Sequence, residues 1–220
     1  STMWDWLRGH TQTEALPPQD IPLYVSRLNS SDQPLRLEAI YTLGAMGPAA
    51  LAPLLESLSS VEGQGRIDPP YVQNEDGSYS VNAVMEAQRR WTEGGYIFQD
   101  EAYALGRLGE VAIDPLRQLL QSKDPWIVIN AAFALGQIGH PAARAIDDLT
   151  VLLESADHRV VRAILESIAC IGSNTEAALP AIKKILRTDR ETWHQDTDLP
   201  YLVGDQIHFN AALALLSSDL

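Results

Sequence analysis

The sequence predicts an all-α protein, a right-handed superhelical stack of about five pairs of short helices with two insertions at one edge. One observation is a recurring pattern, clearest from Asn130 to Gly139, which reads Asn-Ala-Ala-Phe-Ala-Leu-Gly-Gln-Ile-Gly. Another is its spacing, since Gly139 follows Gly109 by 30 residues (139 − 109 = 30) and precedes Gly172 by 33 (172 − 139 = 33). The third is a second apolar segment with helical spacing after each of these glycines.

Related copies of the pattern lie on both sides of this stretch. They begin at Glu38, Glu101, Ala163 and, in a truncated form, Asn210. Gly47 and Gly109 are 62 residues apart (109 − 47 = 62), which is close to twice the repeat. We therefore expect an insertion or one degenerate unit between them.

The first helices follow from start and stop signals. Asp20 can cap a helix that runs to about Leu28 with its apolar residues on one face. Pro34 suits the first turn of the next helix, and Gly47 ends that helix before its partner begins. The partner helix carries leucines on one face, at Leu51, Leu54, Leu55 and Leu58.

The later units repeat this plan. One extends from Gln99 to Ser122, the next begins with a cap and a proline at Asp124, and a further unit begins at Asp157. Each first helix ends at a glycine, which we expect to supply a left-handed cap without a Cβ penalty. Small residues should let neighbouring helices approach closely, at Ala39, Ala102, Ala131 and Ala163. The final helix lacks a pairing helix, so its uncovered apolar face would invite a dimer.

The pattern Ala-x-x-x-Leu-Gly-x-Leu/Ile-Gly, followed by a second helix of the Leu-x-x-Leu type, resembles the HEAT repeat. More narrowly, it resembles the short HEAT-like repeats named after phycobilisome lyases. The resemblance covers roughly residues 20–220 apart from the insertions. It implies a helical solenoid, a fold that serves many scaffolds and specifies no activity by itself.

Composition excludes several classes of partner. The formal net charge of −13, from 29 acidic and 16 basic residues, argues against nucleic acids and anionic membranes, which are bound through clustered Lys and Arg. Cys170 is the single cysteine, so the chain fits a reducing compartment. No apolar run reaches the roughly 18 to 20 residues that span a bilayer, and no signal peptide is visible. We expect a cytoplasmic, single-domain protein over residues 1–220, without a cofactor.

Two insertions interrupt the repeat, at about residues 59–98 and 187–204. Both join a second helix to the next first helix, so they should emerge from the same edge of the stack. They contain aromatic residues suited to recognition: Trp91, Tyr96, Phe98, Trp193 and Tyr201. The alternative interpretation is that these side chains fold the insertions onto the solenoid as local plugs.

A second candidate surface is formed by the second helices, which usually line the concave face of such a solenoid. Its solvent-side residues are of mixed sign and include Arg117, Lys183 and Lys184. A polar protein partner suits this surface better than a nucleic acid does. We expect one partner to contact this face and the aromatic edge together.

A metal site is an alternative near the second insertion. His194, Asp196 and His208 could supply a facial set of two histidines and one carboxylate. The His-x-Asp pattern with a distal His also resembles the iron motif of phytanoyl-CoA-type dioxygenases, whose fold is a β jelly roll. The other interpretation is an acidic, solvated loop.

A second enzymatic alternative rests on Gly94-Gly95-Tyr96, which leads into the first helix near Asp100. This stretch is similar to one in bilin lyases of the E/F type and would imply attachment of a linear tetrapyrrole to a phycobiliprotein. The family's basic residues after the Tyr are replaced here by Ile97-Phe98-Gln99. No catalytic set stands out, so we expect a non-enzymatic, protein-binding scaffold or adaptor, with these two enzymatic readings as alternatives.

Overall fold

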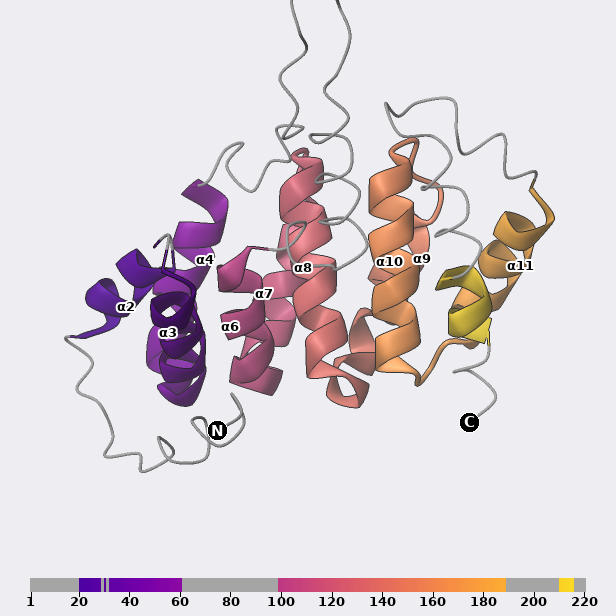
Figure 1. The fold of residues 1–220 in the computed structure, drawn as a ribbon. Coiled ribbons are helices and arrows are strands. Elements are labelled where there is room, and N and C mark those ends of the chain that lie inside the picture. Colours follow the sequence, from indigo (N-terminus) through magenta and orange to yellow (C-terminus); the bar gives the residue numbers. More distant parts are fainter. Residues whose placement is uncertain (1–19, 29, 31, 61–98, 189–209, 216–220) are drawn as a thin grey trace, which may run out of the picture.

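The structure is a computed structural model that describes residues 20–28, 30, 32–60, 99–188 and 210–215. Its regular elements over these residues are helices, with no strand among them. The helices stack side by side in chain order from α2 to α11 (Figure 1). The predicted all-α solenoid is confirmed.

The chain alternates between the first and second helices of successive pairs. A short helix, α2 (Ile21–Arg27), precedes them. The first helices are α3 (Gln33–Ala45), α6 (Asp100–Leu108), α8 (Pro125–Ile138) and α10 (His158–Ile171). The second helices are α4 (Leu51–Ser60), α7 (Ile113–Leu119), α9 (Ile146–Leu152) and α11 (Leu179–Arg187). Short 3-10 turns join the helices of each pair, at η2 (Gly47–Ala50), η3 (Gly109–Ala112), η4 (His140–Ala145) and η5 (Glu176–Ala178). Residues 210–215 are also helical.

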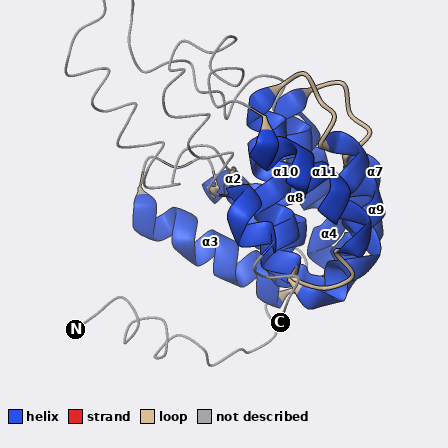
Figure 2. Cartoon of the chain, turned by 90° about the vertical axis from the view of Figure 1, so that its right-hand side faces the viewer, coloured by secondary structure: helices blue, strands red, loops and turns tan. Residues whose placement is uncertain are grey.

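The helices form two layers. In Figure 1 the first helices lie in front of the second helices, and Figure 2 places α7 and α9 on the side away from α3. We call the two outer surfaces the first-helix face and the second-helix face. The part of the chain that is described contains four complete pairs.

A continuous apolar strip between the layers forms the core. Leu43, Leu105 and Leu135, which precede the first glycine of each motif, are fully buried. The second helices contribute Leu54, Leu116, Leu149 and Ile182, which are also fully buried. Each pair leaves one apolar side that the next pair covers, so the core grows along the stack.

Glycines end the first helices as predicted. Gly47, Gly109, Gly139 and Gly172 have φ values of 67°, 72°, 75° and 63°. Gly172, with ψ 9°, is left-handed helical, but Gly109 and Gly139 have ψ of −140° and −142°. This second conformation mirrors the extended chain and is essentially restricted to glycine.

The predicted cap at Asp124 is confirmed, and Asp157, where a further unit was predicted to begin, also caps its helix. Asp124 accepts a hydrogen bond from the Trp126 backbone N–H at 2.9 Å, and Asp157 accepts one from the Arg159 backbone N–H at 2.9 Å. The prediction for Asp20 is wrong, because its side chain makes no capping hydrogen bond. Its backbone has φ −85° and ψ −9°, whereas a capping residue is usually extended.

A different set of glycines marks close contacts between the first helices. A Cβ atom at Gly44 would lie 2.6 Å from Arg107 Cβ, and one at Gly106 would lie 2.7 Å from Gln137 Cβ. At Gly136 it would lie 3.2 Å from Ser167 Cα. The predicted alanines are buried in the same layer, at Ala39, Ala102, Ala131 and Ala163. Gly44 and Gly106 leave the space that a side chain of the next repeat occupies, and Gly136 leaves room for the close approach of the Ser167 backbone.

The insertions fall almost entirely outside the described residues. Ser59 and Ser60 complete α4, and Arg187 completes α11. Residues 61–98 and 189–204 are not among those described. The prediction that both insertions emerge from one edge is therefore still a prediction.

Candidate functional site

A groove of about 610 Å³ crosses three consecutive first helices. Its walls come from α3, α6 and α8, and the side chains that define its chemistry are Arg36, Tyr41, Asp100, Tyr103, Arg107 and Gln137. We call it the first-helix groove. It lies on the first-helix face, whereas the sequence interpretation placed the candidate surface on the second helices.

The repeat itself places Tyr41 and Tyr103 at the groove and Phe133 next to it, in the lining of a neighbouring hollow. Tyr41, Tyr103 and Phe133 each lie three residues before the first glycine of their motif, so they occupy equivalent positions on α3, α6 and α8. Tyr103 and Phe133 meet edge to face, with ring centroids 4.7 Å apart and an interplanar angle of 71°. Such contacts stabilise the arrangement beyond the area that they bury. The aromatic side chains thus form a row from one repeat to the next.

One end of the groove contains an ion pair between repeats. Arg36 Nε of α3 lies 3.0 Å from Asp100 Oδ2 of α6. Another Arg36 nitrogen donates a hydrogen bond to the Ser30 carbonyl at 2.9 Å. Burial raises the pKa of Asp100, and the Arg36 guanidinium lowers it by less, so the net shift is upward. This arginine is held in place by partners within the chain.

Arg107 stands beside this pair in a different environment. Its guanidinium carbon lies 4.0 Å from the centroid of the Tyr41 ring, a cation–π contact between α6 and α3. The side chain is exposed, and among the described residues no carboxylate lies within ion-pair distance of it. Within the part of the chain that the structure describes, the positive charge of Arg107 at the groove is therefore uncompensated.

The aromatic part of the groove is not set up for proton transfer. Burial, followed by the nearby Asp100 carboxylate, raises the pKa of Tyr103 above its ordinary value of 10.0. The phenol therefore stays protonated at neutral pH. It can donate or accept a hydrogen bond but does not serve as a base.

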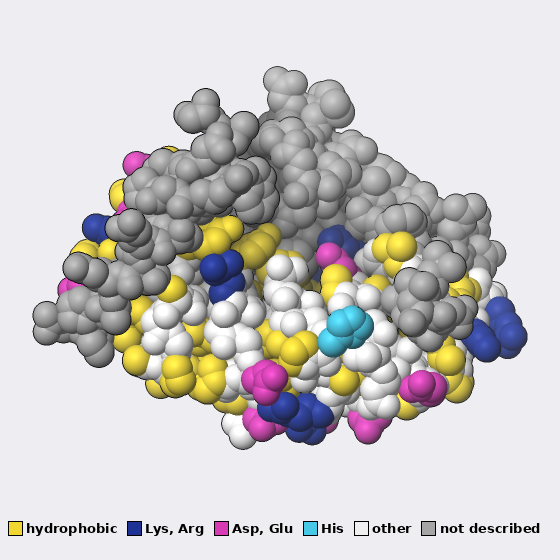
Figure 3. Space-filling view, turned by 90° about the horizontal axis from the view of Figure 1, so that it is seen from below, with side chains coloured by type: hydrophobic (Ala, Val, Ile, Leu, Met, Phe, Trp, Pro, Cys, Tyr) yellow, Lys and Arg dark blue, Asp and Glu magenta, His cyan; other side chains and the backbone are white. Residues whose placement is uncertain are grey.

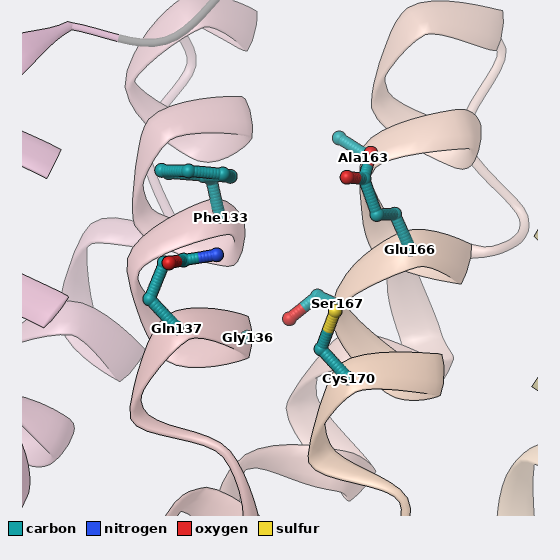
Figure 4. Close-up of a pocket in the computed structure, with 7 residues that line it drawn as sticks. All are labelled: Phe133, Gly136, Gln137, Ala163, Glu166, Ser167 and Cys170. Atoms are coloured by element: carbon teal, nitrogen blue, oxygen red, sulfur yellow. The ribbon is translucent and has the colours of Figure 1, made fainter. Parts of the chain in front are cut away.

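A smaller hollow lies one repeat further along, between α8 and α10. Phe133 and Gln137 project from α8, and Glu166, Ser167 and Cys170 from α10 (Figure 4). Its volume is about 10 Å³, room for about one water molecule. Ser167 is used structurally, because its hydroxyl donates a 2.6 Å hydrogen bond to the Ala132 carbonyl. Burial and then Glu166 raise the pKa of Cys170, which disfavours a reactive thiolate.

Two of the three second-helix residues that we predicted to bind a partner already form ion pairs with neighbouring repeats. Arg117 Nε lies 2.6 Å from Asp148 Oδ2 in the next repeat, and Lys184 Nζ lies 3.3 Å from Glu154 Oε2 in the preceding one. Lys183 is exposed, and no ion pair to it occurs within the described part of the chain. Of these three residues, Lys183 is therefore the one whose charge no described residue compensates.

The other predicted site residues lie outside the described residues. These are the aromatic residues Trp91, Tyr96, Phe98, Trp193 and Tyr201, and the metal candidates His194, Asp196 and His208. Over the residues that are described, no group of three or more His, Cys, Asp or Glu side chains could hold a metal ion. None of the helices described there is long and apolar enough to cross a membrane.

The surface of the molecule that is seen from below carries charges of both signs. Figure 3 shows acidic and basic side chains next to one another there, without a broad field of one sign. Ion pairs also join neighbouring repeats, as between Arg144 and Asp114 at 3.1 Å. Much of the charge on the second helices therefore holds neighbouring repeats together.

Sequence reasoning missed the first-helix groove, although a signal for it was present. The signal is the aromatic residue three positions before the first glycine, at Tyr41, Tyr103 and Phe133. Helical periodicity alone assigns these residues to the core. Tyr41 and Tyr103 line the groove and Phe133 lines the neighbouring hollow, and these places depend on how closely the first helices pack.

Two family models of helical repeats match the chain. The model described as HEAT repeats matches residues 113–195, and the model described as PBS lyase HEAT-like repeat matches residues 35–60 and 102–122. The chain is a HEAT-repeat protein, and its repeats resemble those of phycobilisome lyases. No curated protein matches it in sequence.

Several solved structures of designed proteins are similar to the chain at low identity. A designed armadillo repeat protein in complex with the peptide (KR)4 is 18% identical, with a TM-score of 0.42, over 90% of this chain and 99% of that one. Computationally designed armadillo repeat proteins for modular peptide recognition are 21% identical, with a TM-score of 0.41, over 90% and 99%. A further engineered protein is 19% identical, with a TM-score of 0.39, over 91% and 86%.

Proposed function

We propose that this chain is a non-enzymatic scaffold that binds a segment of a partner protein in the first-helix groove. The observation that carries the proposal is the groove itself, about 610 Å³ across three consecutive repeats. That volume falls within the range of ligand-binding clefts, about 300–1,000 Å³. Its lining combines tyrosines, arginines and a glutamine, and Tyr and Arg are enriched at protein interfaces.

The direction of the groove favours an extended polypeptide as the ligand. It runs across the helices, and the small hollow between α8 and α10 continues the same row. Packed helices lie about 8–10 Å apart, and an extended chain advances about 3.3 Å per residue. About six residues of a partner would therefore span the three helices of the groove.

The aromatic edge and Lys183 are the rival or additional contact surfaces. Because Lys183 has no carboxylate partner within the described stack, it can contribute to a polar interface on the second-helix face. Trp91 and Trp193 belong to the edge that we predicted from the sequence. A partner larger than a peptide could extend from the groove onto either surface.

The test is a selection from phage-displayed random peptides of about a dozen residues, twice the span estimated above. Peptides that bind the wild type would be measured by fluorescence anisotropy against three variants. Gln137→Trp places a larger side chain at the groove, Lys183→Ala changes the second-helix face, and a Trp91→Ala/Trp193→Ala double variant removes the predicted aromatic edge.

We expect Gln137→Trp to weaken binding most, and far-UV circular dichroism to show that all variants keep their helices. Loss of binding only in Lys183→Ala or only in the double tryptophan variant would move the site to that surface. If the selection yields no peptide that binds the wild type, the proposal of a peptide-binding groove fails.

A bilin lyase is the second candidate, and one observation favours it. Residues 35–60 and 102–122, which match the PBS lyase HEAT-like repeat, contain most of the groove lining. Arg36 and Arg107 could bind carboxylates there, and Tyr41 and Tyr103 could stack on a pyrrole ring. Co-expression with a bilin source and a phycobiliprotein subunit would give a coloured subunit if this function holds. A colourless subunit would exclude it.

We further propose a single domain that acts in a reducing compartment such as the cytoplasm. One buried apolar cluster extends from Ile21 to Ala214, which supports a single folding unit. The lone Cys170 fits the compartment.

Leu213, exposed on the last described helix, would take part in the proposed dimer contact, which sedimentation of the purified chain would reveal.

A further inference from the structure

The charges of the described residues that line the first-helix groove do not cancel. Two arginines and one aspartate line it, within a chain whose formal net charge is −13. Arg36 is paired with Asp100 at 3.0 Å and also donates to the Ser30 carbonyl. Asp100 is therefore committed to Arg36, and among the described residues of the groove the second arginine, Arg107, has no counter-charge.

With respect to the described residues, Arg107 keeps its hydrogen-bonding capacity. It has five N–H donors, and its described contact is with the face of the Tyr41 ring, 4.0 Å from the guanidinium carbon. A ring face attracts the cation but does not satisfy those donors as a carboxylate would. The side chain is exposed, so a ligand in the groove can reach it.

The packing of the repeat explains why Arg107 lies at this place. A Cβ atom at Gly44 would lie 2.6 Å from Arg107 Cβ and 3.1 Å from its Nε. The absence of a side chain at Gly44 lets the arginine lie across the junction between α3 and α6, beside Tyr41. The equivalent residue of the next repeat is Gln137, which is neutral, so the charge occurs at one step of the groove.

We infer that the first-helix groove selects polypeptide segments that carry an acidic side chain, and that Arg107 binds its carboxylate. This inference rests on the proposed function. The acidic protein repels such a segment elsewhere, so its binding depends on the local charge at Arg107. Arg107 also offers the planar donor geometry that pairs with a carboxylate in a bidentate manner.

The experiment compares the peptides selected by four proteins from the same random library. These are the wild type, Arg107→Gln, Arg107→Glu and Lys123→Gln; the last removes an exposed cation between α7 and α8 and serves as the matched control. We expect Asp and Glu to be enriched among peptides bound by the wild type and by Lys123→Gln. Arg107→Gln should lose this enrichment, and Arg107→Glu should favour Lys and Arg.

Affinity measurements give the second readout. For the best acidic peptide, Arg107→Gln should bind about ten- to a hundredfold more weakly than the wild type, which corresponds to the loss of one charge-assisted hydrogen-bonded pair. Replacing the acidic residue of the peptide by its amide should cause a similar loss with the wild type and little further loss with Arg107→Gln. Arg107→Lys should restore part of the affinity.

Two results would overturn the inference while leaving peptide binding intact: selected peptides without acidic enrichment, or equal affinities for the wild type and Arg107→Gln. Loss of affinity for the acidic peptide in Lys183→Ala but not in Arg107→Gln would assign the acidic preference to the second-helix face and also overturn the inference. If no peptide binds the wild type, the proposed function itself fails. Thermal unfolding of each variant would establish that the exposed substitutions leave the fold intact.

Discussion

At the scale of single residues, the two glycines of the repeated Leu-Gly-x-Leu/Ile-Gly pattern have different physical roles. The first lies inside a helix and leaves room for a neighbour, as at Gly106, where a Cβ would lie 2.7 Å from Gln137 Cβ. The second adopts a backbone conformation that disfavours other residues, as at Gly109 with φ 72° and ψ −140°. Replacing the first creates a steric clash, whereas replacing the second creates backbone strain.

The clean test of the second role is Gly109→Ala. A new methyl group would have no neighbour within 4 Å, so only the backbone opposes it. We expect the free energy of unfolding to fall by about 1–3 kcal/mol in urea titrations followed by circular dichroism. Gly172→Asn is the control, because φ 63° and ψ 9° form a left-handed helical position that Asn tolerates. Equal losses for the two variants would contradict this account.

At the scale of elements, two aspartates at helix N-termini have pKa values that shift in opposite directions. Asp157 caps α10. Burial raises its pKa, but hydrogen bonds from the Arg159 side chain and backbone N–H lower it by more, so the pKa lies below its ordinary value. Asp100 begins α6, and there burial outweighs Arg36, so the net pKa is raised. Both shifts start from an ordinary value of 3.8.

These directions predict opposite effects on acid stability. Because the folded pKa of Asp157 is depressed, its contribution is present above pH 3.8 and is lost as the pH falls through the lower folded value. Asp157→Asn keeps a good cap and should reduce the loss of stability on acidification. Because the folded pKa of Asp100 is raised, its protonation favours the folded state as the pH falls from that pKa toward 3.8. Asp100→Asn removes this contribution and should make the loss of stability on acidification steeper. Thermal midpoints from pH 7 to pH 3 would check both slopes, and parallel curves would disprove the prediction.

Sequence patterns predicted the elements better than they predicted the site. Pro34, the cap at Asp124 and the start of a unit at Asp157 were identified correctly because a helix start is a local property. The contacts of Gly44 and Gly106 were missed because they depend on which side chain of the next repeat lies opposite. The groove was missed for the same reason, since the charge of Arg107 matters only where Asp100 is already paired with Arg36.

At the scale of the whole molecule, stability is the sum of junctions between neighbouring repeats. The junction between α8 and α10 combines three contributions: buried apolar residues, the Ser167 hydrogen bond to the Ala132 carbonyl, and the close approach at Gly136. Other junctions add buried polar contacts, as where the Asn130 side chain accepts a 2.7 Å hydrogen bond from the Gln99 N–H. In such a stack each repeat is stabilised chiefly by its immediate neighbours.

The α8–α10 junction therefore offers a test of how the stack unfolds. A Cβ at Gly136 would lie 3.2 Å from Ser167 Cα, a backbone atom that cannot rotate away. Gly136→Val should displace α10 from α8, weaken the Ser167 bond and uncouple the C-terminal pair, α10 and α11, from the rest. Hydrogen exchange should then accelerate in α10 and α11 while protection persists in α3 and α6. Gly136→Ala is the milder control, because its single methyl group requires a shift of only tenths of an ångström. The higher helix propensity of alanine offsets the cost of that shift by about 1 kcal/mol. Uniform acceleration along the chain in Gly136→Val would mean that the stack unfolds as one cooperative unit, contrary to a nearest-neighbour description.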